Sequence, residues 1–432
     1  MPAVKTQRKR PESRLVDPSD IGDSSVKRFV KIAAALAVAS AFTSQAQAAG
    51  FMLTEQSAGA LGRAYAGVGV DGLDISGMFY NPATMSLHSG TMMQAGFVQI
   101  GVNAEYQGVI SGAHENGRLK SQTIPHGYLM HQINDSVWAG LAMTVPWGMG
   151  TEYADGWEGR GRGTASKLRS FDFNPNMAWK VSDSLTVGAG VSIQYVAANL
   201  KVGAQDATLG QFTTEYKADS MDWGFNVGAM WKPVDSLRFG VSYRSEIAHH
   251  TKGWFATYSK FGEKKMDATL DVSGPAWAMA TVAWDATDAL SLYGTFRWTQ
   301  WSSFGDLNIK ISNTPIVKTI PNKWKDTYLG TVGFDYHIDG RWTVRSGVGY
   351  ETSAIDDYRN RTAVLPDADR WWFAAGLGCR YSKDLQFDIG ASWLKGVHER
   401  SLYTGNDTGN VEFGRYDKLD AYLFGVQMVY SF

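Results

Sequence analysis

The sequence predicts an all-β fold, a 14-stranded antiparallel transmembrane β-barrel with a small N-terminal hatch, or plug, inside its lumen. Short polar turns recur at intervals of 45 to 53 residues, and the segments between them alternate between apolar and polar side chains. Each interval holds two strands of roughly 10 residues and one long loop, which is typical of a membrane barrel with tight turns on one side. The turns are centred on Asp135, Asp183, Asp235, Asp288, Asp339 and Asp384. If both chain ends lie on the tight-turn side, six such turns imply 14 strands.

The composition favours a barrel over other membrane and soluble classes. Charged residues make up only 19% of the chain, while 47 glycines, 16 tryptophans, 19 tyrosines and 20 phenylalanines are present. The sequence has no apolar run of about 18 residues, the length that a transmembrane helix needs. The net charge of −1 gives nucleic acid no electrostatic attraction, so no nucleic-acid partner is expected.

The N-terminal region predicts export. Lys27, Arg28 and Lys31 precede an apolar stretch over residues 32–42, and Ala46-Gln47-Ala48 follows as a cleavage site, so residues 26–48 are predicted to be a signal peptide. Residues 1–25 are interpreted as a mis-assigned start or a disordered, charge-rich extension. We therefore expect the chain in the outer membrane of a Gram-negative bacterium. The lone Cys379 can form no internal disulfide.

The remaining chain divides into a plug over residues 49–89 and a barrel over residues 90–432. Residues 49–89 lack alternation with a period of two; residues 53–65 are weakly helical, and residues 67–83 are rich in glycine and turn formers. The segment is too short to fold alone, and it is tethered to a tube that would otherwise be open. We therefore expect it to fill the barrel lumen.

The last strand shows the barrel pattern most clearly. Its bulky side chains occupy every second position and smaller or more polar ones lie between, which places the two sets on opposite faces. The bulky set, expected to face lipid, is Tyr422, Phe424, Val426, Met428, Tyr430 and Phe432. Because backbone polar groups in hydrocarbon must all be paired, such strands are stable only as a closed ring.

The same parity places an excess of positive charge in the lumen. Its expected members are Arg238, Arg244, Arg297, Lys325 and Arg345, set against Asp335 and Asp388. A lipid-facing Arg or Lys at the membrane midplane would cost about 2 to 4 kcal/mol, so the absence of charge from the outward positions supports the parity. For the arginines of the lumen, structural ion pairs are favoured over ligand binding. For Lys325 the two interpretations stay open.

At this point the sequence resembles the FadL family of outer-membrane long-chain fatty acid transporters. The resemblance covers the whole chain after residue 48. It rests on Ala49-Gly50-Phe51, Leu61-Gly62-Arg63-Ala64-Tyr65-Ala66-Gly67, Asn81-Pro82-Ala83, Tyr243-Arg244-Ser245-Glu246, Trp301-Ser302-Ser303-Phe304, Trp324-Lys325-Asp326, Pro366-Asp367-Ala368-Asp369-Arg370 with Trp372, and the last strand. The family fold is a 14-stranded barrel with an N-terminal hatch, in agreement with the turn count.

The resemblance implies that a ligand is captured outside and released sideways into the membrane, through a wall gap beside an inward kink in the third strand. Pro146 and Gly148 are the candidates for this gap, because proline lacks a ladder donor and glycine weakens a strand. The hatch signature Asn81-Pro82-Ala83 is expected to pack near the gap. The family also implies a basic pair for the ligand carboxylate. Lys325 matches one member, but Ala197 stands where the second, an Arg, is expected.

The resulting hypothesis is a passive transporter of long-chain fatty acids, with Lys325, Arg345, Arg297 and Arg244 as candidate ligand-binding residues. Each buried methylene contributes about 0.8 kcal/mol, so an acyl chain needs an apolar exit. Alternatives are a channel for hydrocarbons or aromatic compounds and a non-transporting surface barrel.

No Gly-x-Ser-x-Gly setting is present, so no enzyme is expected, and no cofactor or metal. The expected partners are the hydrophobic ligand, outer-membrane lipid and lipopolysaccharide, and the barrel assembly machinery, with the chain a monomer.

Overall fold

A computed structural model describes residues 50–109, 111–116, 121–154, 156–320, 322–398, 400–404 and 411–432. The predicted signal peptide over residues 26–48 and the extension over residues 1–25 lie outside the described residues. No helix among the described residues is long and apolar enough to cross a membrane.

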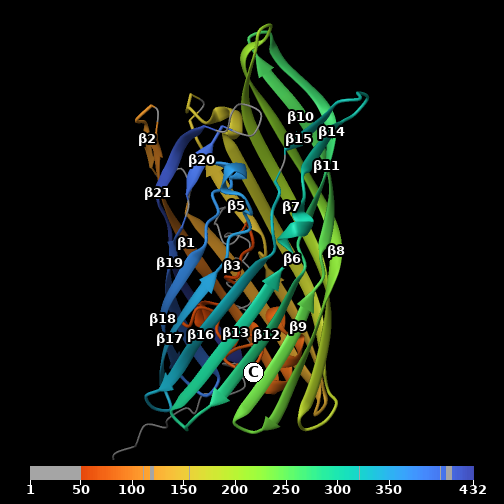
Figure 1. The fold of residues 1–432 in the computed structure, drawn as a ribbon. Helices are drawn as coiled ribbons and strands as arrows, with labels where there is room; N and C mark the ends of the chain where they lie inside the picture. The colour runs from red at the N-terminus through yellow and green to blue at the C-terminus, as the bar shows by residue number, and fades with distance from the viewer. Residues whose placement is uncertain are drawn as a thin grey trace, which may run out of the picture.

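The described chain forms a closed antiparallel barrel of 14 wall strands, as predicted, and several of these strands are divided into two segments (Figure 1). The ring closes where β1 pairs with β21, from Met92 opposite Ser431 to Gly108 opposite Gly414. Two short strands, β2 (His114–Asn116) and β20 (Ser401–Tyr403), extend the rim. The wall consists, in order, of β1 (Thr91–Gly108), β3 (Gln122–Asn134), β4 (Val137–Thr144) with β5 (Gly148–Glu152), β6 (Ala165–Lys180), β7 (Leu185–Asp206), β8 (Gly210–Val234), β9 (Leu237–Arg244) with β10 (Ile247–Ser259), β11 (Gly262–Gly274) with β12 (Trp277–Asp285), β13 (Leu290–Thr299) with β14 (Leu307–Ile311), β15 (Val317–Ile320) with β16 (Thr327–His337), β17 (Trp342–Glu351), β18 (Arg370–Arg380), β19 (Leu385–Gly396) and β21 (Glu412–Ser431).

All six polar turns lie where the sequence places them, between paired neighbouring strands. Asp135 joins β3 to β4, and Asp339 joins β16 to β17. The tight turns share one end of the barrel, the lower end in Figure 1, whereas β7, β8, β10 and β11 rise far beyond the other strands at the upper end. The turn count therefore gives the correct number of strands.

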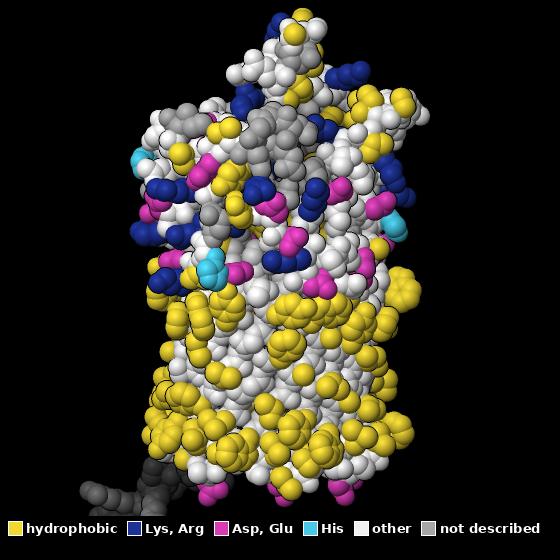
Figure 2. Space-filling view, viewed as in Figure 1, with side chains coloured by type: hydrophobic (Ala, Val, Ile, Leu, Met, Phe, Trp, Pro, Cys, Tyr) yellow, Lys and Arg dark blue, Asp and Glu magenta, His cyan; other side chains and the backbone are white. Residues whose placement is uncertain are grey.

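The predicted parity of the wall is also confirmed. In β21, Tyr422 and Phe424 are exposed while Leu423 and Gln427 are buried. In β13, Phe296 is exposed and Arg297 is buried. Figure 2 shows the result on one face: hydrophobic side chains cover the lower part of the wall, and charged side chains gather above them. The outer surface therefore has an apolar band of the kind that contacts lipid.

The segment from Gly50 to Leu87 lies inside the barrel and is almost entirely buried (Figure 1). It contains the short helices α2 (Ala58–Leu61), α3 (Gly77–Tyr80) and η1 (Pro82–Leu87). Ser57 caps α2 by accepting a hydrogen bond from the Ala60 amide at 3.1 Å, and the Asn81 side chain caps η1. We call this segment the plug.

Glycines on the inner face of the wall let the plug backbone approach very closely. A Cβ atom added at Gly376 of β18 would lie 2.8 Å from the Gly62 Cα, and one at Gly347 of β17 would lie 2.2 Å from the Arg63 carbonyl oxygen. Contacts under 3.0 Å are not tolerated by backbone atoms, so only glycine fits at these positions. The abundance of glycine in this chain thus partly reflects the seating of the plug.

We predict that Gly376→Val displaces α2 from the wall. The added side chain collides with backbone, and overpacking of this kind costs roughly 1 to 3 kcal/mol. The thermal unfolding midpoint of the detergent-solubilised protein should fall, and protease should cleave the plug faster.

Gly330→Val is the matched control, because a Cβ at Gly330 meets nothing within 4 Å. An equal loss of stability in both variants would show that the seat of the plug does not depend on the close approach at Gly376.

Candidate functional site

The wall is interrupted within its third strand. β4 pairs with β6 as far as Thr144 opposite Asp172, and β5 resumes at Gly148 opposite Arg169. Three residues on one strand therefore oppose two on the other, which is a β-bulge that bends the strand. On the other side, β3 pairs with β4 only from Gly127 onward, and among the described residues its upper part, 122–126, pairs with β1 alone. We call residues 145–147 the kink.

The plug supplies the hydrogen bonds that the first half of the kink lacks. The Gln56 side chain accepts from the Val145 amide at 3.2 Å and donates to the Val145 carbonyl at 2.8 Å. The Leu53 amide donates to the Pro146 carbonyl at 2.8 Å, and proline has no amide of its own to satisfy. These two residues are therefore fully paired without a neighbouring strand.

The second half of the kink is completed by one wall residue and by the start of the plug. The Ser170 hydroxyl accepts from the Trp147 amide at 2.9 Å and donates to the Trp147 carbonyl at 2.7 Å. The Gly148 amide donates to the Phe51 carbonyl at 2.9 Å. Because an unpaired backbone group in hydrocarbon is very unfavourable, the break in the wall exists only because Ser170 and the plug replace the missing strand contacts.

An aromatic cluster surrounds the start of the plug beside the kink. The Phe51 ring lies 5.8 Å from Trp147, 4.7 Å from Trp301, 4.9 Å from Phe304 and 6.0 Å from Trp324, measured between ring centroids. Trp301 and Phe304 come from the short helix η3 (Trp301–Phe304), and Trp301 is completely buried. Phe51 therefore fills an apolar site that an equally apolar ligand group would suit.

Lys325 does not lie inside a wall strand, contrary to the expectation from the sequence. β16 begins at Thr327, so Lys325 belongs to the preceding connection, where its side chain is 49% exposed and its Nζ lies 3.8 Å from the Asp356 carboxylate. The alternation in the sequence continues past the start of β16 into this connection, so it does not mark where the strand begins. Lys325 nevertheless follows Trp324 of the aromatic cluster directly.

Ala197 faces outward, so it cannot occupy a position in a luminal carboxylate site. It pairs with Arg169 of β6 and with Asp219 of β8, and it shares its side of β7 with the exposed Tyr195. The expectation of a luminal basic residue at position 197 is therefore wrong, since odd-numbered residues of this part of β7 point away from the lumen.

Three of the predicted luminal arginines, Arg244, Arg297 and Arg345, are buried in ion pairs. The fourth, Arg238, is partly exposed and lies 3.1 Å from Asp285. Arg244 lies 3.2 Å from Asp172 and also stacks over the Phe79 ring of the plug at 4.6 Å. Arg297 lies 3.0 Å from Glu351 and donates to the Thr54 hydroxyl at 2.8 Å. Each thus joins an acidic group of the wall to the plug.

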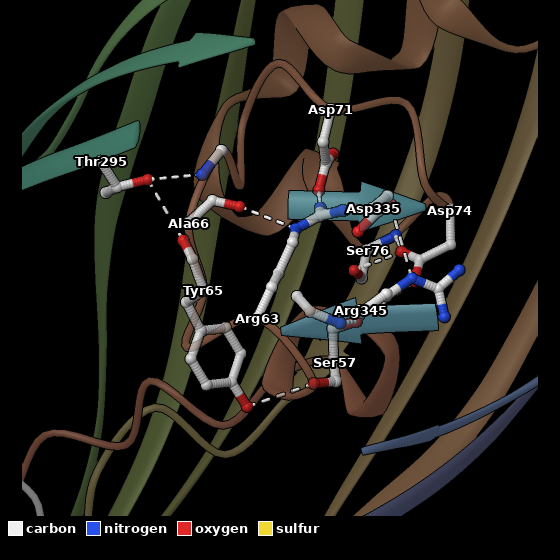
Figure 3. A network of polar contacts seen from close by, with 12 residues as sticks. Ser57, Arg63, Tyr65, Ala66, Asp71, Asp74, Ser76, Thr295, Asp335 and Arg345 are labelled. Carbon is white, nitrogen blue, oxygen red and sulfur yellow. Dashed lines mark hydrogen bonds and ion pairs between the residues drawn. The ribbon is translucent and has the colours of Figure 1, made fainter. Parts of the chain in front are cut away.

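Arg345 belongs to a larger network that includes Arg63 of the plug, which was not among the predicted site residues (Figure 3). Arg345 lies 2.8 Å from Asp388 and 3.5 Å from Asp335. Arg63 of the plug donates to Asp335 at 2.8 Å and pairs with Asp71. The network fixes the middle of the plug to β16, β17 and β19.

The hatch signature packs against β7 and β8 and not beside the kink. Asn81 donates to the Ala229 carbonyl at 3.0 Å, and a Cβ at Gly188 would lie 2.7 Å from Pro82 Cβ and 2.8 Å from the Ala83 amide. The expected place of this signature near the break is therefore wrong, because residues 51–56 contact the kink instead.

Glu55 is a further residue that sequence reasoning missed. It is completely buried in the plug, and neither carboxylate oxygen has a hydrogen-bond partner in the described structure. Burial raises the pKa of Glu55 from 4.5 to about 7. The backbone of Glu55 itself lowers the pKa, as do the positive charges of Arg297 and Arg370, whereas the negative charge of Glu351 raises it further. No periodic pattern marks such a residue in the sequence.

A closed barrel with an apolar outer band and an internal plug defines a β-barrel membrane protein. A family model described as outer membrane protein transport protein (OMPP1/FadL/TodX) matches residues 39–432. The chain belongs to this family, as the resemblance in its sequence indicated, and it is an outer-membrane protein of a Gram-negative bacterium.

Individual relatives agree with this assignment. The chain is 27% identical to the long-chain fatty acid transport protein of Salmonella typhi, over 94% of this chain and 99% of the relative. The crystal structure of a Pseudomonas aeruginosa FadL homologue superposes with a TM-score of 0.79 at 26% identity, covering 89% of this chain and all of that one. The Pseudomonas putida toluene transporter TodX shares the fold, with a TM-score of 0.69 at 16% identity over 89% of this chain and 100% of that one.

The burial of Glu55 predicts that the plug is seated more firmly in acid. With a pKa of about 7 when seated and 4.5 in water, the protonated carboxyl favours the seated state below pH 4.5, and this contribution is lost as the pH rises through 7. The protection factors of residues 50–60 in hydrogen exchange, which are corrected for the intrinsic pH dependence of exchange, should therefore be lower at pH 8 than at pH 5.

Glu55→Gln keeps the shape but cannot titrate, so it should remove this difference. If the variant retains the full pH dependence, another group controls the seating of the plug.

Proposed function

We propose that this protein takes up long-chain fatty acids from outside the cell and releases them sideways into the outer membrane at the kink. The observation that carries the proposal is the interrupted wall, whose backbone groups are paired by plug residues and by one serine. A ligand that displaces residues 51–56 would remove those substitute partners and open the break toward lipid. No catalytic step and no cofactor take part.

The energetics favour a sideways exit over an aqueous one. Each buried methylene contributes about 0.8 kcal/mol, so a long acyl chain gains on the order of 10 kcal/mol in an apolar site. Release into water would require the whole of that free energy. Release into the membrane requires little, because lipid is as apolar as the aromatic cluster around Phe51.

A fatty acid also carries a carboxylate, and Lys325 is our candidate for its partner. Lys325 lies beside Trp324 at the exposed edge of the aromatic cluster, and its weak 3.8 Å pairing with Asp356 can be exchanged for a ligand. The buried arginines are less suited to this role, because their carboxylate partners already occupy them. The name of the S. typhi relative, long-chain fatty acid transport protein, supports a fatty acid as the ligand.

Hydrocarbon or aromatic uptake is the second candidate. The cluster around Phe51 is built from aromatic rings, which suit neutral cargo, and the related fold of TodX is named as that of a toluene transporter. The two candidates differ in whether the positive charge of Lys325 matters.

We further propose that the barrel acts as a monomer and is inserted by the barrel assembly machinery, which reads its aromatic last residue, Phe432.

Uptake of labelled oleate tests the function. Bacteria that lack their own fatty acid transporter should accumulate oleate when they express this chain. Deletion of Val145 removes the extra residue of the bulge and allows continuous pairing, so it should reduce uptake at least tenfold while the folded barrel remains in the membrane.

Val145→Ala, which preserves the strand length, is the control and should leave uptake unchanged. Full uptake by the deletion variant would exclude release at the kink. If the unmodified chain supports uptake of neither oleate nor hydrocarbons, a non-transporting surface barrel is the correct interpretation.

Lys325→Ala should distinguish the two cargo classes. Loss of a cation next to a carboxylate is expected to lower oleate affinity several-fold and to leave toluene or alkane uptake unchanged, as measured by concentration-dependent uptake.

Lys310→Ala is the matched control, because Lys310 is likewise exposed and pairs with a surface acid, Asp271, at 3.4 Å. Equal losses for charged and neutral cargo in Lys325→Ala would remove the anchor role of Lys325.

A further inference from the structure

Glu55 lies where the plug contacts the kink, between two residues that hold the plug there. Leu53 donates to one carbonyl of the kink, and Gln56 bonds both backbone groups of Val145. Glu55 itself is completely buried, and among the described residues no side chain donates to its carboxyl oxygens. A cargo molecule that displaces residues 51–56 therefore also moves this carboxyl group out of its buried place.

The positive charges near Glu55 are already matched by carboxylates of the wall. Arg297 lies 3.0 Å from Glu351, and Arg370 pairs with Asp367. An ionised Glu55 would thus add a buried negative charge without a partner, which is so unfavourable that such a group keeps a proton instead. The charged or titratable groups that act on Glu55 are Arg297 of β13, Glu351 of β17, Arg370 of β18, and the neutral Tyr65 and Tyr80 of the plug.

In the proposed function, the cargo and Glu55 exchange environments. A fatty acid carries the same functional group as a glutamate side chain, so both ionise near pH 4.5 in water. When the end of the plug is displaced, Glu55 reaches water and becomes the stronger acid. The cargo carboxylate moves among the rings around Phe51, which offer it no ionic partner, and becomes the stronger base. The exchange therefore drives a proton from Glu55 to the cargo.

We propose that Glu55 gives its proton to the carboxylate of the fatty acid, which then leaves at the kink as the neutral acid. The O–H bond of Glu55 breaks, an O–H bond forms on the cargo, and the ionised Glu55 takes a new proton from water before the plug returns. A neutral acid enters lipid far more readily than a carboxylate does. This inference rests on the proposed function. It gives Glu55 a part distinct from that of Lys325, which attracts the cargo while it is still charged.

Glu55→Gln tests the transfer, because glutamine has a similar size and no acidic proton. The full chain, expressed in bacteria that lack their own transporter, should be compared for uptake of oleate and of oleyl alcohol, a neutral chain of equal length. At pH 8 the variant should lower the maximal rate of oleate uptake relative to that of oleyl alcohol at least tenfold, since a positioned proton donor typically contributes about a hundredfold or more. The deficit should shrink toward pH 5.5, where more oleate arrives already protonated.

Three further variants isolate the acidic proton. Glu55→Asp keeps a carboxyl group and should restore most of the oleate uptake. Glu263→Gln changes an exposed glutamate of β11 and is the matched control, with both rates as in the unmodified chain. If Glu55→Gln folds poorly, Glu55→Leu replaces it, because an apolar side chain suits a buried site without an ionic partner. Heat-dependent mobility in electrophoresis identifies the folded barrels.

The outcomes separate this inference from the proposed function. Equal losses of oleate and oleyl alcohol uptake would show that Glu55 only seats the plug. Full oleate uptake by a folded Glu55→Gln or Glu55→Leu barrel at pH 8 would exclude the proton transfer. Either result overturns the inference and leaves release at the kink intact. If the unmodified chain carries no oleate at any pH, the proposed function fails, and the inference fails with it.

Discussion

The structure depends on one constraint: in hydrocarbon, every backbone amide and carbonyl of the wall must have a partner. A closed ladder satisfies this constraint along most of the wall, but at residues 145–147 the bulge separates the strand from its neighbours. There the partners are Gln56 and Leu53 of the plug and Ser170 of the adjacent strand, and Phe51 pairs with Gly148 directly after the kink. The barrel can therefore contain an interruption without leaving an unpaired polar group, but only while the plug end stays in place.

The plug is held by two kinds of contact that differ in strength. Its middle is fixed by buried charges, among them Arg63 with Asp335, and breaking a buried pair typically costs about 3 to 5 kcal/mol. Its first residues are held by the rings around Phe51, by neutral hydrogen bonds to the kink and by one hydrogen bond from the charged Arg297 to Thr54. Fewer buried charges therefore hold the end beside the kink than hold the middle of the plug. This division agrees with a family whose members carry molecules through the outer membrane.

The sequence alone predicted the features that repeat along the chain, such as the turns and the alternation of side chains. It could not predict contacts that occur only once. Turn spacing and alternation depend on neighbours within one strand, so the strand number, the closing strand and the inward position of Arg345 could be predicted. The partnership of Gln56 with Val145 joins residues 89 positions apart and arises only when the plug enters the ring. Lys325 was misplaced because periodicity does not show where a strand begins. Glu55 carries no pattern at all, since its property is burial without a partner.

The pairing of the first strand with the last also constrains how the molecule is assembled. β1 follows the plug directly, and its partner β21 is the final element of the chain, so the seam between them joins the two most distant parts of the wall. The loop that this seam closes is nearly the whole barrel, and it carries the largest entropic penalty of any strand pair. The plug backbone lies against glycines of β17 and β18 with no space for threading. The seat of the plug and the curvature of the ring are therefore matched to each other, because a change in that curvature would move these glycines against the plug backbone or away from it.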